Sequence, residues 1–180
     1  MLCACTLLNT SAGFPSSYTE KEKLLDGILE ILRLHQQIQW CVSTLGKRGC
    51  VLVRKGQTEN ETREEFNEKI LDDLEQQSKL LSTSSDVPVP TKGYYKGNEV
   101  IFCTSSQVEC VTDTTGCGDA FVGALIFSIT QNWPLEQALS YATTVAGLKT
   151  LQVGARAALP SSQHPKLLQV INYFNKHNTQ

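Results

Sequence analysis

The sequence predicts an α/β fold, in which helices cover a sheet, and three observations support this prediction. A pattern typical of an amphipathic helix (residues 18–37) leads directly into two short β-rich segments, 40–44 and 50–53. Strand-like segments return at 99–104 and 108–111, and a glycine-bearing turn then opens a strongly apolar helix. Alternation of helical and strand patterns is typical of a layered α/β domain.

The composition excludes several classes of protein. The chain has 180 residues, of which 41% are hydrophobic, and its formal net charge is −2. This length is sufficient for one domain with a core, and the charge offers no general attraction for nucleic acid or anionic lipid. No segment approaches the ~20 apolar residues of a membrane-spanning helix. We therefore expect a soluble domain that binds neither nucleic acid nor membrane.

The N-terminal segment, residues 1–17, is expected to be ragged. It is apolar but has no basic residue, which makes it a poor signal or transit peptide. The seven cysteines include no C-x-x-C pair, which favours free thiols in a reducing compartment. Cys3 and Cys5 form a C-x-C with no second pair nearby, so metal binding there is the weaker interpretation. The predicted location is cytoplasmic, with an organellar one left open.

The first helix has leucine and isoleucine at helical spacing, as in Leu25, Ile28 and Leu32. Thr19 stands three residues before Glu22, so a capping box is expected at its start. The two β-rich segments that follow flank a turn containing glycine.

A change of composition follows, and residues 57–97 are expected to form a charged insertion. Phe66, Ile70 and Leu74 lie at i, i+4 and i+8, which favours a surface helix with a narrow apolar stripe. A partner-binding helix is the alternative, but a charge-rich insertion in a loop is more usual. The run STSSDVPVPTKG, with two prolines, is typical of a linker or mobile loop.

Three helices are predicted in the last third of the chain. The apolar segment 120–131 is the first, and Trp133-Pro134 ends it and starts the next, with Pro134 at the first helical position. The second helix covers residues 135–152 and the third covers 165–176.

The stretch VTDTTGCGDAF (residues 111–121) has the chemistry of a phosphate site. Gly116, Cys117 and Gly118 form a turn into a helix, whose first N–H groups lack intrahelical partners and carry the positive end of the helix dipole. Glycine lets an anion approach the backbone. Asp119 follows, and a carboxylate there can accept a proton from an attacking hydroxyl. The alternative is an ordinary glycine turn in which Asp119 only caps the helix.

Three motifs together resemble the PfkB family of carbohydrate kinases. DTTGCGDAFVGAL is similar to the family's C-terminal signature D-T-T-G-A-G-D-x-F, and only Cys117 departs from it. Thr44-Leu45-Gly46 and Gly49 look like its nucleotide-binding T-L-G-x-x-G strand and turn. QVGARAALPS (152–161) resembles the Gly-Ala…Leu-Pro loop that closes over the nucleotide. The resemblance implies an incomplete ribokinase-like fold, the C-terminal part of a mainly parallel sheet flanked by helices.

The resemblance also implies roles for particular residues. Asp119 would be the catalytic base, and the N–H groups of Gly116, Cys117 and Gly118 would form the anion hole. The residues implied for ATP are Thr44, Gly46, Gly49, Thr143 and Gly154. Thr143 follows Ala142 where the family commonly has an Ala-Asn pair near the adenine.

Two kinds of cation are implied as well. Mg²⁺ would accompany ATP, mostly through phosphates and water. A monovalent cation such as K⁺ would lie near Asp113 and Thr115, with carbonyl groups of the 154–158 loop, including Ala158.

No segment before Tyr18 resembles the sugar-binding half with which members of the family begin. We therefore expect a truncated carbohydrate kinase that transfers the γ-phosphoryl group of ATP to a sugar or nucleoside hydroxyl, and that is inactive alone if it lacks an acceptor pocket. The alternative is a non-catalytic ATP-binding or partner-binding remnant. An exposed sheet edge would favour a homo-oligomer or another partner.

Overall fold

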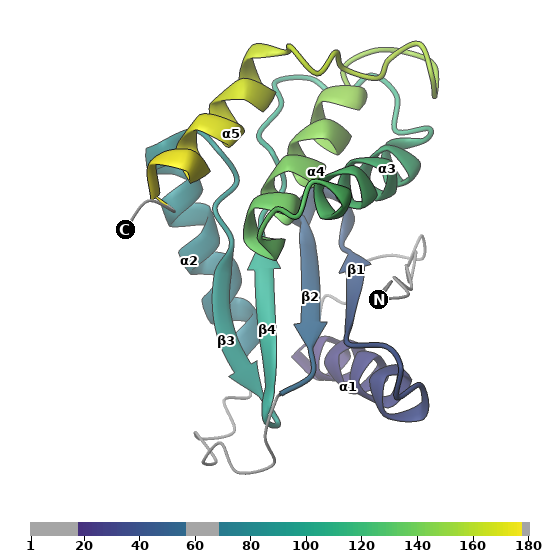
Figure 1. The fold of residues 1–180 in the computed structure, drawn as a ribbon, viewed down its shortest axis with the longest axis vertical. Coiled ribbons are helices and arrows are strands. Elements are labelled where there is room, and N and C mark those ends of the chain that lie inside the picture. The colour runs from purple at the N-terminus through teal and green to yellow at the C-terminus, as the bar shows by residue number, and fades with distance from the viewer. Residues whose placement is uncertain (1–17, 57–68, 178–180) are drawn as a thin grey trace. The chain divides into compact units, whose positions relative to one another are not determined.

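The computed structural model describes residues 18–56 and 69–177 (Figure 1). They divide into two compact units. The first unit holds the described residues up to Gln77 together with Thr91–Phe102. The second holds Ser78–Pro90 and the described residues from Cys103 onward. The expected C-x-C of Cys3 and Cys5, the capping-box side chains of Thr19 and Glu22, and Phe66 lie outside the described residues.

The first unit is built on a four-stranded sheet with the order β1-β2-β4-β3. Its strands are β1 (Trp40–Thr44), β2 (Cys50–Arg54), β3 (Thr91–Tyr95) and β4 (Asn98–Cys103). The β1–β2 and β3–β4 pairs are antiparallel, so the expectation of a mainly parallel sheet is wrong for both. The connections explain the difference, because each is a short turn and a parallel pair needs a crossover of a dozen or more residues.

The core of the first unit lies between the sheet and two helices. Helix α1 (Tyr18–Leu34) packs on β1 and β2. Its predicted apolar residues are buried, as are three residues at the start of α2 (Ile70–Ser85). The buried cluster contains Leu25, Ile28, Leu32, Ile70, Leu71, Leu74, Val51, Val53, Val100 and Phe102 among others. Ile70 and Leu74, two residues of the apolar stripe predicted in the charged segment, are therefore part of this core.

The linker interpretation of STSSDVPVPTKG is wrong. Its first four residues complete α2, and its last residues begin β3. Val87 and Val89 between them are buried, and the buried Ser78 hydroxyl donates to the Val89 carbonyl at 2.6 Å. Buried valines fix this segment in place, which the Ser/Pro composition alone does not reveal.

The second unit is mainly helical. It contains α3 (Cys117–Thr130), α4 (Leu135–Lys149) and α5 (Pro165–His177), with α4 packed against both of the others. Pro134 caps α4 one position before the helix begins, not at its first position as predicted. Among the described residues, no helix is both long and apolar enough to cross a membrane.

The strand expected at 108–111 is absent, and residues 104–114 have no regular secondary structure. The N–H groups of Thr112 and Asp113 instead donate to the carbonyl of Thr150, at 2.7 and 3.1 Å. These two bonds fix the first residue of the DTTGCGD motif, and the residue before it, to the end of α4.

Candidate active site

The DTTGCGD motif turns sharply into α3 at Gly116. This residue has φ 76° and ψ 8°, the left-handed conformation that glycine adopts at little cost. A Cβ atom at Gly116 would lie 3.0 Å from the Cβ of Ala155 and 3.3 Å from its Cα. Glycine is thus required here for conformation and for the close approach of the 154–158 loop.

The first turn of α3 presents backbone N–H groups at its open end. The N–H of Cys117 already donates to the Thr114 carbonyl at 3.1 Å, and the Gly116 carbonyl accepts from Ala120 at 2.9 Å. The N–H groups of Gly118 and Asp119, one step further along, have no acceptor within the helix by its geometry. A Cβ atom at Gly118 would have no neighbour within 4 Å, so the space beside these groups is open. Of the three residues of the expected anion hole, Gly116, Cys117 and Gly118, the structure thus leaves the Gly118 N–H open, whereas the Cys117 N–H already has an acceptor.

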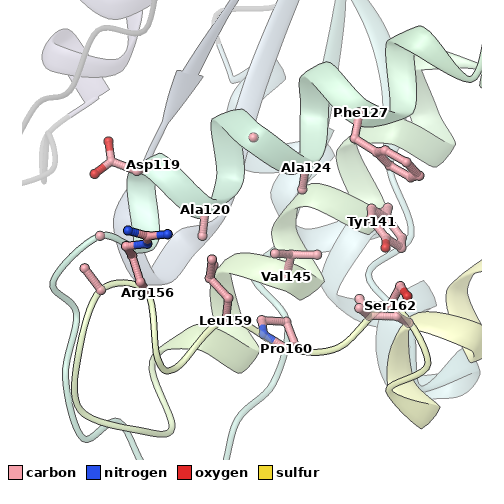
Figure 2. A pocket seen from close by; sticks show the side chains of 14 residues that line it. Asp119, Ala120, Ala124, Phe127, Tyr141, Val145, Arg156, Leu159, Pro160 and Ser162 are labelled. Atoms are coloured by element: carbon pink, nitrogen blue, oxygen red, sulfur yellow. The ribbon is translucent and has the colours of Figure 1, made fainter.

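Asp119 is exposed in the first turn of α3. Figure 2 shows its carboxylate directed outward at the N-terminal end of the helix, with the Arg156 guanidinium at the same end. Both residues line a pocket of about 450 Å³ between α3, α4 and the loop that follows α4. The rest of its lining is mostly apolar: Ala120, Ala124, Phe127, Val145, Leu159 and Pro160. One end of this pocket thus combines a carboxylate, a cation and a helix N-terminus.

Asp113 lies at the centre of a polar network. Its Oδ1 accepts the Thr115 N–H at 2.8 Å, and its Oδ2 accepts the Gly154 N–H at 2.9 Å. The Lys149 ammonium donates to the Asp113 backbone carbonyl at 3.0 Å and lies 3.7 Å from Oδ2. The Gly154 N–H, followed by the Thr115 bonds and the Lys149 charge, holds the pKa of Asp113 well below its usual range. Asp113 is therefore a carboxylate whose charge is already balanced by the protein.

The 154–158 loop turns back on itself. Gly154 has φ 102°, and its carbonyl accepts the N–H of Ala158 at 3.3 Å. The Arg156 carbonyl accepts from Leu159 at the same distance, and Ala158 is buried. Thus two carbonyls of the loop expected to hold a monovalent cation already accept hydrogen bonds.

Three residues expected to contact ATP lie in the first unit, in and after β1. Thr44 ends the strand, while Gly46 and Gly49 have φ 57° and 114° in the turn to β2. The Leu45 N–H donates to the Gly49 carbonyl at 2.7 Å, and the Gly49 N–H to Gly46 at 3.1 Å. The T-L-G-x-x-G pattern thus forms a tight, glycine-dependent hairpin turn, as its spacing suggests.

Thr143, the residue expected near the adenine, is in α4 and only 5% exposed. Its hydroxyl pairs with the Cys103 thiol, with Oγ1 and Sγ 3.9 Å apart. Tyr141 and Val145, not Thr143, face the pocket. The structure therefore places Thr143 inside the second unit.

Sequence reasoning missed Lys149 and Arg156. Lys149 continues a buried stripe of α4 that runs through Ala138, Ala142 and Val145, at spacings of four, three and four residues. A lysine on such a stripe signals a buried charge with a fixed partner. Arg156 lies within the matched loop motif, and its position on the pocket depends on the fold.

Among the described residues, no three His, Cys, Asp or Glu side chains are grouped so that they could hold a metal ion. Mg²⁺ that enters with ATP fits this arrangement, because phosphate oxygens and water can supply its ligands. A monovalent cation at Asp113 fits poorly, because the Lys149 ammonium lies 3.7 Å from Oδ2 and would repel it, and because the carbonyl and both carboxylate oxygens already accept hydrogen bonds.

Known proteins resemble this chain in sequence and in fold. Ribokinase of Schizosaccharomyces pombe is 36% identical over 89 residues, which cover 48% of this chain and 26% of that protein. Arabidopsis thaliana ribokinase, solved with ribose and ATP, has a TM-score of 0.52 and 16% identity over 87% of this chain. Escherichia coli phosphofructokinase-2, solved with potassium, has a TM-score of 0.51 and 18% identity over 88%.

The chain spans about a quarter of the length of the yeast ribokinase and about a third of the two solved structures. The structural likeness confirms the ribokinase fold for the part that is present. A model of the pfkB family carbohydrate kinases matches residues 57–162, more than half of the sequence. The chain therefore belongs to the pfkB family of carbohydrate kinases.

Proposed function

We propose that this chain carries the phosphoryl-transfer site of an ATP-dependent kinase whose acceptor is a sugar or nucleoside hydroxyl. The observation that carries the proposal is the opening of α3, where the glycine turn at Gly116 begins a helix whose first N–H groups lack intrahelical acceptors, beside the exposed Asp119 carboxylate. The family supports it, and so does the relative solved with ribose and ATP.

The proposed reaction uses two features of this opening. In the Gly116–Gly118 turn, the open N–H of Gly118, together with that of Asp119, binds the oxygens of the γ-phosphoryl group, where the helix dipole also favours negative charge. Asp119 accepts the proton of the acceptor hydroxyl as that oxygen bonds to the γ-phosphorus. The bond from the γ-phosphorus to the bridging oxygen breaks, and ADP leaves with the electron pair.

Other residues would assist this transfer. Arg156 lies at the same end of the pocket and would offset negative charge on the phosphates. Gly154 would contact ATP from the loop after α4. Bound Mg²⁺ would neutralise charge on the phosphates.

The experiment compares Asp119→Asn with the wild type in two measurements. Binding of Mg-ATP is measured by thermal unfolding, because a ligand of the native state raises Tm by mass action. Transfer to sugars and nucleosides is measured with labelled ATP. We expect Asp119→Asn to keep the Tm increase and to lose transfer by at least ~100-fold.

Asp86→Asn is the matched control. Asp86 is exposed in the same unit and has φ 57°, a conformation that asparagine also tolerates. It should behave as the wild type in both measurements. ATP binding without transfer in the wild type would favour the non-catalytic alternative, and absence of ATP binding would overturn the proposal.

A further inference from the structure

The strongest feature that the proposed reaction does not use is the buried lysine beside Asp113. The Lys149 side chain is 0% exposed, and that of Asp113 is 20% exposed. Burying an ammonium group is costly unless it is paired and hydrogen-bonded, so this position requires a defined partner. Asp113 provides both a carbonyl acceptor and a carboxylate.

The ammonium lies where the family resemblance leads one to expect a monovalent cation. That expectation rests on Asp113, Thr115 and the loop carbonyls. An alkylammonium carries the same charge as K⁺ and has a similar size at its nitrogen. Its distances of 3.0 Å to a carbonyl and 3.7 Å to a carboxylate oxygen provide the charge balance that such an ion would provide.

Every oxygen of Asp113 accepts a hydrogen bond from the surrounding residues. Thr115 and Gly154 each donate a backbone N–H to one carboxylate oxygen, and Lys149 donates to the carbonyl. Two carbonyls of the adjacent loop are also used, by Ala158 and Leu159. An added cation would have to compete with these donors and would experience repulsion from the ammonium.

We propose that the Lys149 ammonium replaces the monovalent cation at Asp113, so that this chain needs no K⁺ to order the loops around the Gly116–Asp119 site. The inference rests on the proposed function, because that function assigns these loops to a catalytic site. The contact between Lys149 and Asp113 itself does not depend on catalysis. A tethered charge also avoids the entropy cost of capturing a free ion.

The test measures thermal unfolding of the full chain at matched ionic strength in KCl and in tetramethylammonium chloride, whose cation is too large for a compact site. The wild type should melt within ~1 °C of the same temperature in both salts. Lys149→Ala removes the charge and opens space. We expect its Tm to fall by at least ~5 °C in tetramethylammonium chloride and to recover with saturating KCl.

Lys149→Met is the matched control, because it removes the charge but fills the space. It should show the same loss in both salts. A saturable increase of the wild-type Tm that occurs in KCl but not in tetramethylammonium chloride would overturn the proposal. A Tm of Lys149→Ala that does not increase with KCl would also overturn it.

A second measurement uses only the wild type, so it tests the proposal even if neither variant folds. Thallium(I), an NMR-visible analogue of K⁺, should show no saturable binding to the wild-type chain. Saturable binding that K⁺ displaces would overturn the proposal. Both measurements are separable from the proposed kinase activity, because a chain that fails to bind ATP still reports whether a cation binds.

Discussion

Two glycine-containing turns, one in each unit, are each held by a cation and a carboxylate in different ways. In the first unit, the turn from Gly46 to Gly49 is fixed to α2 by the ion pair of Arg48 and Glu75, whose side chains are 20% and 8% exposed. In the second unit, the loop before Gly116 is fixed by Lys149, which has no exposed surface. Arg48 binds a side chain, whereas Lys149 donates to backbone.

The difference shows which interactions hold each turn in position. Burial lowers the pKa of the Arg48 guanidinium, while the charge of Asp72 opposes the shift, so this guanidinium is partly buried and has a second carboxylate nearby. Arg48 joins two elements that also have an apolar core in common. The loop at Asp113 has no regular structure, and its position depends on polar contacts to Lys149, Thr150 and Gly154. We therefore expect the stability of the protein to depend more on Lys149 than on Arg48.

The largest effect is expected from removing the two cations one at a time. Lys149→Met should lower the free energy of unfolding by about 3 kcal/mol, because it leaves the Asp113 network without its buried positive charge. Arg48→Met should lower it by about 1–2 kcal/mol, because the Arg48 side chain is 20% exposed and solvent already screens part of its interaction with Glu75. Urea unfolding of the two variants and the wild type measures both losses. Equal losses of unfolding free energy in the two variants would show that the two turns do not differ in their dependence on the cation.

The next effect concerns the glycine that opens α3. Gly116→Ala should lower the free energy of unfolding by about 1–2 kcal/mol, since alanine resists positive φ and its methyl would press on Ala155. Gly118→Ala is the control for stability, because it has open space and lies two residues into the helix. It should leave the urea midpoint unchanged or raise it. A loss at Gly118 as large as that at Gly116 would contradict the steric explanation.

The smallest effect near neutral pH is expected from the titration of Asp113. Because folding lowers its pKa, the stabilisation is complete above about pH 4, the ordinary value for Asp, and is lost as the pH falls further. The difference in the free energy of unfolding between wild type and Asp113→Asn should thus be constant from pH 7 to about pH 5 and shrink below about pH 4. Urea midpoints across this range provide the measurement. A difference that grows on acidification would show that the carboxylate is not held in its charged form.

Local patterns in the sequence predicted local structure well. The first hairpin strand is as predicted, the second is longer by one residue, and the last helix extends one residue further. The glycine turn into α3 was also predicted, because its signal lies within a few residues. Each of these elements is defined by spacing that the sequence displays directly.

The errors come from contacts between distant residues. Residues 108–111 have β-rich composition, but the N–H groups that follow them bond to Thr150, about 40 residues later. The Asp113–Lys149 contact spans 36 residues, so no motif displays it. The proline-containing segment 86–90 is fixed by the burial of Val87 and Val89, which composition hides.

The contact between Gly116 and Ala155 has a consequence for natural variation. The two positions are 39 residues apart, yet a methyl group at one would touch the methyl group of the other at 3.0 Å. A larger residue at 155 would press on the turn that opens α3, and a larger residue at 116 would displace the loop after α4. We therefore expect glycine to be kept at 116, where φ is also positive, and only alanine or glycine to be tolerated at 155.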